Sequence, residues 1–373
     1  MDRRRALDAA LIGIGLLMAA AIIWTARPHA SGPPSLSQAL ARLARQPADV
    51  AAVRELGLAL ARNGRDREAE PVMRLAARMG WRDADTQAWL LRRDLGLGAF
   101  DAAFARADAL LRRPVDDPAR ASAIAAVMDA ARDPSASEPR ARRLATRPWW
   151  RAGFLEQLDR APGGTAPVRA ILLALARSPA QPTPEETAPY INRLVAAGRF
   201  DEALADWRRL SPDGAGDLRS GGFGEAPDGT PFAWEIAGGG GGEAAITLRE
   251  DSPGNRALWA DAGGDGVPLL ARQMLVLPSG RYVLRWRVQG DGERLRWRVQ
   301  CVDDGRQVAK AASQAPSPAW RDAALAIDVP ADRCRAQWLA LAAEPGDGRA
   351  SAWYDDMEIA PVGPGPSGSP ARR

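Results

Sequence analysis

The chain has 373 residues, enough for about two domains of ordinary size, and 46% of them are hydrophobic. Its 50 basic residues include a single lysine, Lys310, and the only histidine is His29. Mechanisms with a histidine base and P-loops with a lysine are therefore poorly supported. Two cysteines are too few for a zinc site of the usual kind. The net charge of +4 is spread among interleaved acidic and basic residues, so we expect no nucleic-acid binding.

The N-terminal segment combines three arginines with an apolar run. Arg3, Arg4 and Arg5 precede the uncharged stretch 9–24, which ends at Trp24. A helix of about eighteen residues covers about 27 Å, close to the thickness of a bilayer core. We therefore predict a transmembrane anchor over residues 1–26, with the arginines in the cytoplasm and the rest of the chain outside it. A cleaved signal peptide is the alternative, and it would leave the rest of the chain on the same side.

A Pro/Gly/Ser stem at 27–36 leads into a helical region at 37–212 that is rich in Ala, Leu and Arg. Blocks of the form Gly-x-x-x-x-Ala begin at Gly64, Gly98 and Gly198. We expect each glycine to permit a tight turn and each alanine to let two helices cross closely. With its period of about 34 residues, this pattern resembles the tetratricopeptide repeat, a stacked helical array that usually binds a partner protein. Core packing between helices is the plainer role for all these residues.

From 217 to 361 the periodicity approaches two, and glycine, valine and aromatic residues become frequent. About nine short strands predict an antiparallel β-sandwich or jelly roll. The expected strands are 232–236, 244–249, 256–261, 269–276, 280–289, 293–303, 321–329, 335–342 and 350–359. The predicted fold class is therefore α + β and multidomain, with a transmembrane helix, a helical repeat array and a sandwich. The residues 362–373 should form a disordered tail.

Within the expected strands 280–289 and 293–303, the segments 284–289 and 295–301 are separated by a short glycine-rich stretch, which predicts a hairpin. In both, apolar residues alternate with arginines, so the apolar side chains should face the core and the arginines the opposite face. The arginines are Arg285, Arg287, Arg296 and Arg298. One interpretation is a solvated face with local Asp and Glu partners. The other is a patch for carboxylate-bearing sugars, because guanidinium groups match carboxylates.

Both cysteines, Cys301 and Cys334, lie in the β half. Outside the cytoplasm a disulfide can persist, and we predict that these two residues form one. In the chain-entropy model a loop of this size contributes about 3 to 4 kcal/mol. Two buried free thiols are the alternative.

Three motifs of the β half resemble the jelly-roll carbohydrate-binding modules. They are Gly221-Gly-Phe-Gly-Glu225 at the start, Leu277-Pro-Ser-Gly-Arg-Tyr282 before a central strand, and Trp353-Tyr-Asp-Asp-Met-Glu-Ile359 at the end. The resemblance implies glycan binding through exposed aromatic rings that stack on sugars. Trp259 and Trp320 are expected near loops and are the candidates for this role.

The same resemblance implies a structural calcium ion where the two ends of the domain meet. Its ligands here would be Glu225 together with Asp355 or Asp356. However, Gly224 stands where the family has an acidic residue directly after Phe223. Because the sequence departs from the family at this position, we predict no resident cofactor.

With its anchor and repeats, the chain resembles membrane-bound repeat proteins that accompany bacterial exopolysaccharide or O-antigen biosynthesis. This implies a location in the bacterial inner membrane, with most of the chain in the periplasm. We expect a non-catalytic adaptor for polysaccharide assembly or export, whose helices bind a partner protein and whose sandwich binds an acidic polysaccharide. The alternatives are a protein scaffold with a ligand-free sandwich and a glycan-active enzyme that uses two facing carboxylates.

Overall fold

The computed structural model describes residues 33–114, 116–161, 163–211, 217–249, 254–264, 266–346 and 348–362. The predicted anchor at 1–26, most of the stem, and the tail after residue 362 lie outside these ranges. Within them, no helix has the length and apolar character needed to cross a bilayer.

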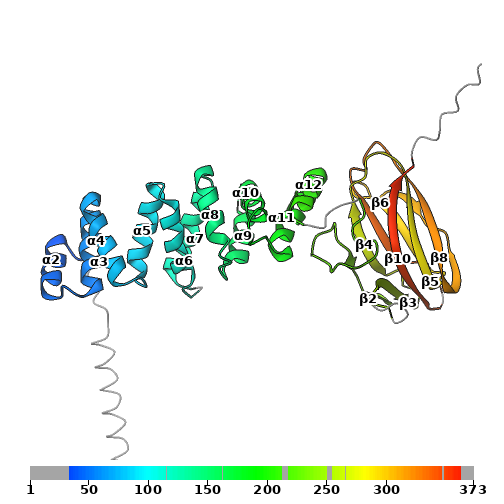
Figure 1. Cartoon of the computed structure of the whole chain (residues 1–373), viewed down its shortest axis with the longest axis horizontal. Helices are drawn as coiled ribbons and strands as arrows, with labels where there is room; N and C mark the ends of the chain where they lie inside the picture. The colour runs from blue at the N-terminus through cyan, green and yellow to red at the C-terminus, as the bar shows by residue number, and fades with distance from the viewer. Residues whose placement is uncertain are drawn as a thin grey trace, which may run out of the picture. The chain divides into compact units, whose positions relative to one another are not determined.

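The expected helical half is confirmed, with eleven α-helices in the described residues (Figure 1). The helices are α2 Leu36–Arg45, α3 Val50–Arg62, α4 Asp66–Met79, α5 Ala84–Gly96, α6 Phe100–Leu111, α7 Pro118–Ala130, α8 Ser137–Leu144, α9 Arg151–Arg160, α10 Thr165–Ala176, α11 Pro184–Ala196 and α12 Phe200–Leu210. A short 3-10 helix, η1 Pro134–Ala136, precedes α8. The described residues form two compact units, and the boundary between Ala123 and Ile124 lies within α7.

The three Gly-x-x-x-x-Ala blocks join helices as expected. Gly64, Gly98 and Gly198 have φ values of 70°, 70° and 69°, in the left-handed region that glycine adopts without strain. They stand between α3 and α4, α5 and α6, and α11 and α12. The alanines of the blocks, Ala69, Ala103 and Ala203, are fully buried. The sequence pattern therefore identifies these three helical hairpins correctly.

The α3–α4 hairpin is packed closely at Gly57. A Cβ atom added to this residue would lie 2.4 Å from Sδ of Met73, which is fully buried on α4. Contacts this short do not occur between unstrained atoms, so a methyl group at this position would force the buried Met73 side chain to move.

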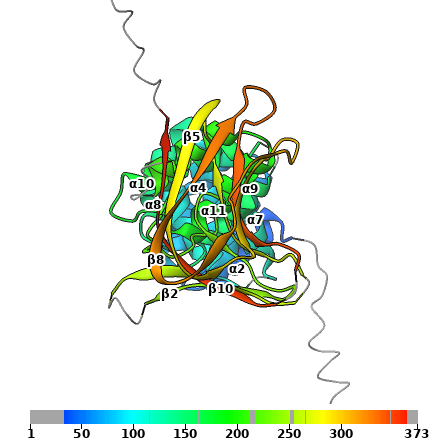
Figure 2. The ribbon, with the colours of Figure 1, turned by 90° about the vertical axis from the view of Figure 1, so that its right-hand side faces the viewer.

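The predicted β-sandwich is confirmed as two five-stranded antiparallel sheets. One sheet has the order β1-β4-β9-β6-β7, and the other has the order β2-β3-β10-β5-β8. Figure 2 labels β2, β5, β8 and β10 of the second sheet. The strands are β1 Glu235–Ile236, β2 Gly242–Leu248, β3 Arg256–Ala262, β4 Leu269–Leu275, β5 Gly280–Gly292, β6 Leu295–Cys301, β7 Gln307–Lys310, β8 Gln314–Val329, β9 Gln337–Ala343 and β10 Ala350–Pro361. The sequence pattern missed β7, which has only 4 residues.

The alternation expected in β5 and β6 is confirmed, but the hairpin is wrong. Trp286 and Trp297 are both buried in one core cluster. However, β5 pairs with β10 and β8, whereas β6 pairs with β9 and β7. The two strands belong to different sheets, and their apolar side chains meet across the core instead of side by side. A short connection between alternating strands has the same local pattern in both arrangements.

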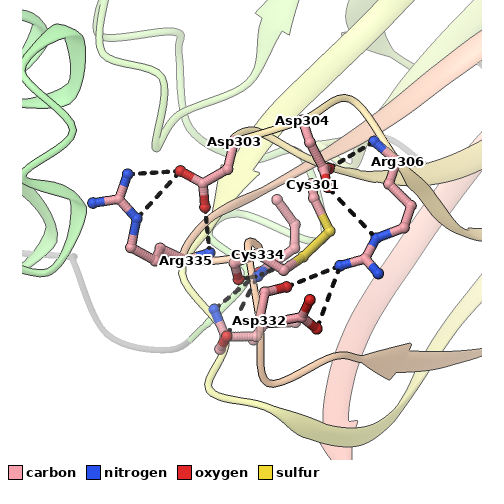
Figure 3. Close-up of a disulfide and its surroundings, with 9 residues drawn as sticks. Cys301, Asp303, Asp304, Arg306, Asp332, Cys334 and Arg335 are labelled. Carbon is pink, nitrogen blue, oxygen red and sulfur yellow. Dashed lines mark hydrogen bonds and ion pairs between the residues drawn. A yellow bond between two sulfur atoms is a disulfide. The ribbon is translucent and has the colours of Figure 1, made fainter.

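The predicted disulfide is confirmed between Cys301, the last residue of β6, and Cys334, shortly before β9. Ion pairs join the same two segments, the loop after β6 and the loop before β9, as Figure 3 shows. Arg335 Nη2 lies 2.7 Å from Asp303 Oδ1, and Arg306 Nη2 lies 3.9 Å from Asp332 Oδ1. The disulfide and these ion pairs join one end of β6 to the start of β9.

Candidate functional site

The outer face of the β2-β3-β10-β5-β8 sheet carries a row of aromatic and amide side chains. On β3 and β10, Leu258 and Tyr354 belong to the core, so their neighbours Trp259 and Trp353 project outward. Trp259 pairs directly with Trp353, and Trp353 pairs on its other side with Gln289 of β5. Three adjacent strands thus place two half-buried indoles and a carboxamide in one row.

An open groove with a volume of about 690 Å³ lies along this row. Its lining includes Thr247, Arg249, Gln289, Pro318, Ser351 and Trp353. The groove therefore combines an aromatic ring with hydroxyl, amide and guanidinium groups.

Hydrogen bonds hold several of these side chains in place. Trp259 Nε1 donates to Ser351 Oγ over 3.2 Å, and Gln289 Nε2 donates to the carbonyl oxygen of Pro318 over 2.6 Å. Among the residues that the structure describes, the Ser351 hydroxyl has no acceptor for its proton and the Gln289 amide oxygen accepts no hydrogen bond. An aromatic surface with a free donor and a free acceptor matches a ligand with many hydroxyl groups.

The structure places the predicted residue Trp320 on β8, next to this groove. The guanidinium carbons of Arg249 and Arg287 lie 4.3 Å and 5.3 Å from the ring centroid. Both distances are within the range of cation–π contacts. Two arginines therefore form cation–π contacts with the Trp320 ring, whereas Trp259 and Trp353 form the aromatic row.

The predicted patch of four arginines does not form. Arg285 and Arg287 lie on β5, and Arg296 and Arg298 lie on β6, so the sandwich core separates the two pairs. This prediction was wrong because it depended on the incorrect hairpin.

Local partners compensate several of the arginine charges. Arg287 Nη1 lies 3.2 Å from Asp356 Oδ2, and Arg298 Nη2 lies 3.6 Å from Glu344 Oε1. Arg296 donates to backbone carbonyls, and Arg285 stands opposite Glu358 on β10. These partners agree with the solvated-face interpretation of the arginines.

The three carboxylates proposed as calcium ligands have other partners. Glu225 forms an ion pair with Arg219, and Asp356 forms one with Arg287. Asp355 is buried, and its Oδ2 accepts a hydrogen bond of 2.9 Å from Asn255 Nδ2. In the part of the chain that the structure describes, no group of three or more His, Cys, Asp or Glu side chains could hold a metal ion.

Sequence reasoning did not identify Trp353 as a candidate for the exposed aromatic surface. A signal was present, because Trp353 and Tyr354 are adjacent and a strand can bury only one of the two. Trp353 shares its parity with Ser351 and Asp355, which indicates the outer face. Arg249 and Gln289 carried no such signal, since their proximity to Trp353 depends on strand order.

No family model matches the chain, and no curated protein matches it. Its β-sandwich resembles those of carbohydrate-binding modules among solved structures. A structure described as "CBM4 structure and function" has 13% identity and a TM-score of 0.31, over 39% of this chain and 99% of that one. The CBM22-1 xylan-binding domain from Paenibacillus barcinonensis has 17% identity and a TM-score of 0.28, over 38% of this chain and 91% of that one. Similarity at this level concerns the fold alone.

Proposed function

We propose that the sandwich binds a glycan on the outer face of the β2-β3-β10-β5-β8 sheet. The observation that carries the proposal is the row of Trp259, Trp353 and Gln289 beside the groove. The C–H faces of a sugar ring stack well on indole, and the polar groups next to it can bind the hydroxyls. Trp353 would be the main stacking surface, with Gln289 and Ser351 as hydrogen-bonding groups.

The charges around the groove favour recognition through hydroxyl groups over recognition through charge. Arg287 is paired with Asp356, and Arg249 Nη1 lies 3.9 Å from Asp355 Oδ2. We therefore propose a neutral glycan in place of the acidic polysaccharide expected from the sequence. Its binding should change little with salt, because ion screening weakens mainly charge–charge attraction.

Binding of the full chain in detergent to xylan, β-1,4-galactan and polygalacturonate, measured by affinity electrophoresis at low and high salt, tests the proposal. Trp353→Ala should weaken binding to a neutral glycan about tenfold or more. The matched control is Trp338→Ala, which removes a half-buried tryptophan from the outer face of the other sheet. Binding that survives Trp353→Ala, or that Trp338→Ala weakens equally, would contradict this site.

We also propose that the chain is a non-catalytic adaptor in the bacterial inner membrane, with residues 1–26 as its anchor and the remainder in the periplasm. The Cys301–Cys334 disulfide supports an oxidising compartment. Protease added to spheroplasts should then degrade all but the N-terminal segment. A full-length chain that stays protected until the membrane is dissolved would contradict this topology. If no glycan binds, the alternative of a scaffold with a ligand-free sandwich takes precedence.

A further inference from the structure

A cleft unrelated to the sandwich lies at the end of the α5–α6 hairpin. It has a volume of about 350 Å³ and is lined by Trp81, Arg82, Gln87, Leu110, Arg112 and Arg113, together with Ala109. Trp81 and Arg82 precede α5, while Arg112 and Arg113 follow α6. Because the two helices are antiparallel, the start of one and the end of the other lie at the same edge of the array.

The polar lining of this cleft offers hydrogen-bond donors almost exclusively. Three of the lining residues are arginines, and none is acidic. Gln87 is buried, and its Oε1 already accepts a hydrogen bond of 2.9 Å from Arg106 Nη1. Its Nε2 has no acceptor among the described residues. A ligand for this cleft must therefore supply acceptors, and a carboxylate is the group that guanidinium forks bind best.

Two of the arginines have a structural role, but Arg82 does not. Arg112 pairs with Asp108 and Arg113 with Asp117, and both stand at the C-terminal end of α6, where positive charge is favourable. Arg82 precedes the N-cap Asp83 of α5, where positive charge is unfavourable, and it has no ion pair within the described residues. Its neighbour Trp81 is 53% exposed.

We propose that this cleft binds an acidic peptide segment of a partner protein, with a carboxylate on Arg82 and Arg113 and an adjacent aliphatic side chain against Trp81. This proposal rests on the proposed adaptor role of the helices and states which kind of partner they bind. It does not depend on glycan binding by the sandwich. Ala109 and Leu110 are apolar lining residues, which suits an aliphatic side chain and would desolvate sugar hydroxyls. The volume accommodates a few side chains, which favours a peptide over a polysaccharide chain.

The test uses the full chain in detergent and a fluorescein-labelled peptide in which glutamate alternates with leucine, followed by fluorescence anisotropy. Arg82→Gln and Trp81→Ala should each weaken binding about tenfold or more, because charged hydrogen bonds and buried aromatic rings contribute on that scale. The control Arg67→Gln removes the same charge from an exposed position near the start of α4. Trp149→Ala removes another exposed tryptophan, in the second compact unit.

Loss of binding in Arg82→Gln and Trp81→Ala, with both controls unchanged, supports the proposal, as does failure of a peptide with glutamine in place of glutamate. The proposal is overturned if the acidic peptide does not bind, or if all variants bind it equally. It is also overturned if polygalacturonate binds at Arg82 and the peptide does not. The variant Trp353→Ala should leave peptide binding intact, so failure of this site and failure of the glycan site are separate results.

Discussion

Trp259 on β3 and Trp353 on β10 stand directly opposite each other on adjacent antiparallel strands, and both project from the outer face of one sheet. The Trp259 indole is also held by its hydrogen bond to Ser351 Oγ, on the same strand as Trp353. The pair is thus oriented before any ligand arrives, which lowers the entropic cost of binding.

If the outer tryptophans serve binding, they should matter little for stability. Trp353→Ala should lower the free energy of unfolding of the sandwich by about 1 kcal/mol, because the indole is only half-buried. Trp297→Ala should lower it by about 3 to 5 kcal/mol, since this residue is buried between Trp234 and Tyr354. Urea unfolding followed by near-ultraviolet circular dichroism measures both values. Equal losses would indicate that Trp353 is a structural residue.

Removal of the disulfide should destabilise the sandwich. The two cysteines are 33 residues apart in sequence, and replacing both by serine should cost about 3 to 4 kcal/mol of unfolding free energy. Chemical unfolding of the oxidised chain, the reduced chain and the double variant provides the measurement. The reduced chain and the variant should agree. Equal stability of the oxidised chain and the double variant would contradict this role of the disulfide.

Gly57→Ala should destabilise the α3–α4 hairpin by about 1 to 3 kcal/mol, because the new methyl group would overlap the buried Met73 side chain. Gly96→Ala in α5 is the matched control. Its added Cβ meets nothing within 4 Å, so the better helix propensity of alanine should leave stability unchanged or raise it by up to about 1 kcal/mol. Thermal unfolding measures both changes. Similar values for the two variants would contradict the close approach at Gly57.

Asp206 of α12 should make the second unit sensitive to acid. Burial by itself would raise the pKa of Asp206, but hydrogen bonds from Arg169, Tyr190 and Arg209 outweigh it and hold this pKa below its usual range. Arg169 Nε lies 2.6 Å from Asp206 Oδ2, and Tyr190 donates to the same oxygen over 2.7 Å. The stabilisation is therefore complete above the unfolded-state pKa near 4 and is lost as the pH falls through the lower folded-state pKa.

Asp206→Asn should accordingly cost about 2 to 4 kcal/mol at neutral pH, and its difference from the unmodified chain should shrink below about pH 4. Urea unfolding at several pH values measures this. The control Asp328→Asn changes an exposed aspartate of β8 and should leave the free energy of unfolding at neutral pH unchanged. A difference that stays constant down to low pH would contradict the assigned ionisation of Asp206.

Local sequence patterns predicted the helical hairpins because the determinants are local. A left-handed turn at Gly64 or Gly198 depends on one residue that lacks a Cβ, and the buried Ala69 or Ala203 follows at a constant distance along the helix. The short strand β7 escaped prediction because 4 residues are too few for alternation to be recognised.

The sequence by itself determined which side chains of β5 and β6 face inward, because alternation along a strand depends only on the pleat of the backbone. It also identified the two cysteines that pair. Only the tertiary structure decided that β5 and β6 belong to opposite sheets, and that Trp259, Trp353 and Gln289 form one row. Which strands pair depends on packing between residues far apart in the chain. The alternation within each strand is the same whichever partner it has, so the pattern cannot predict the pairing.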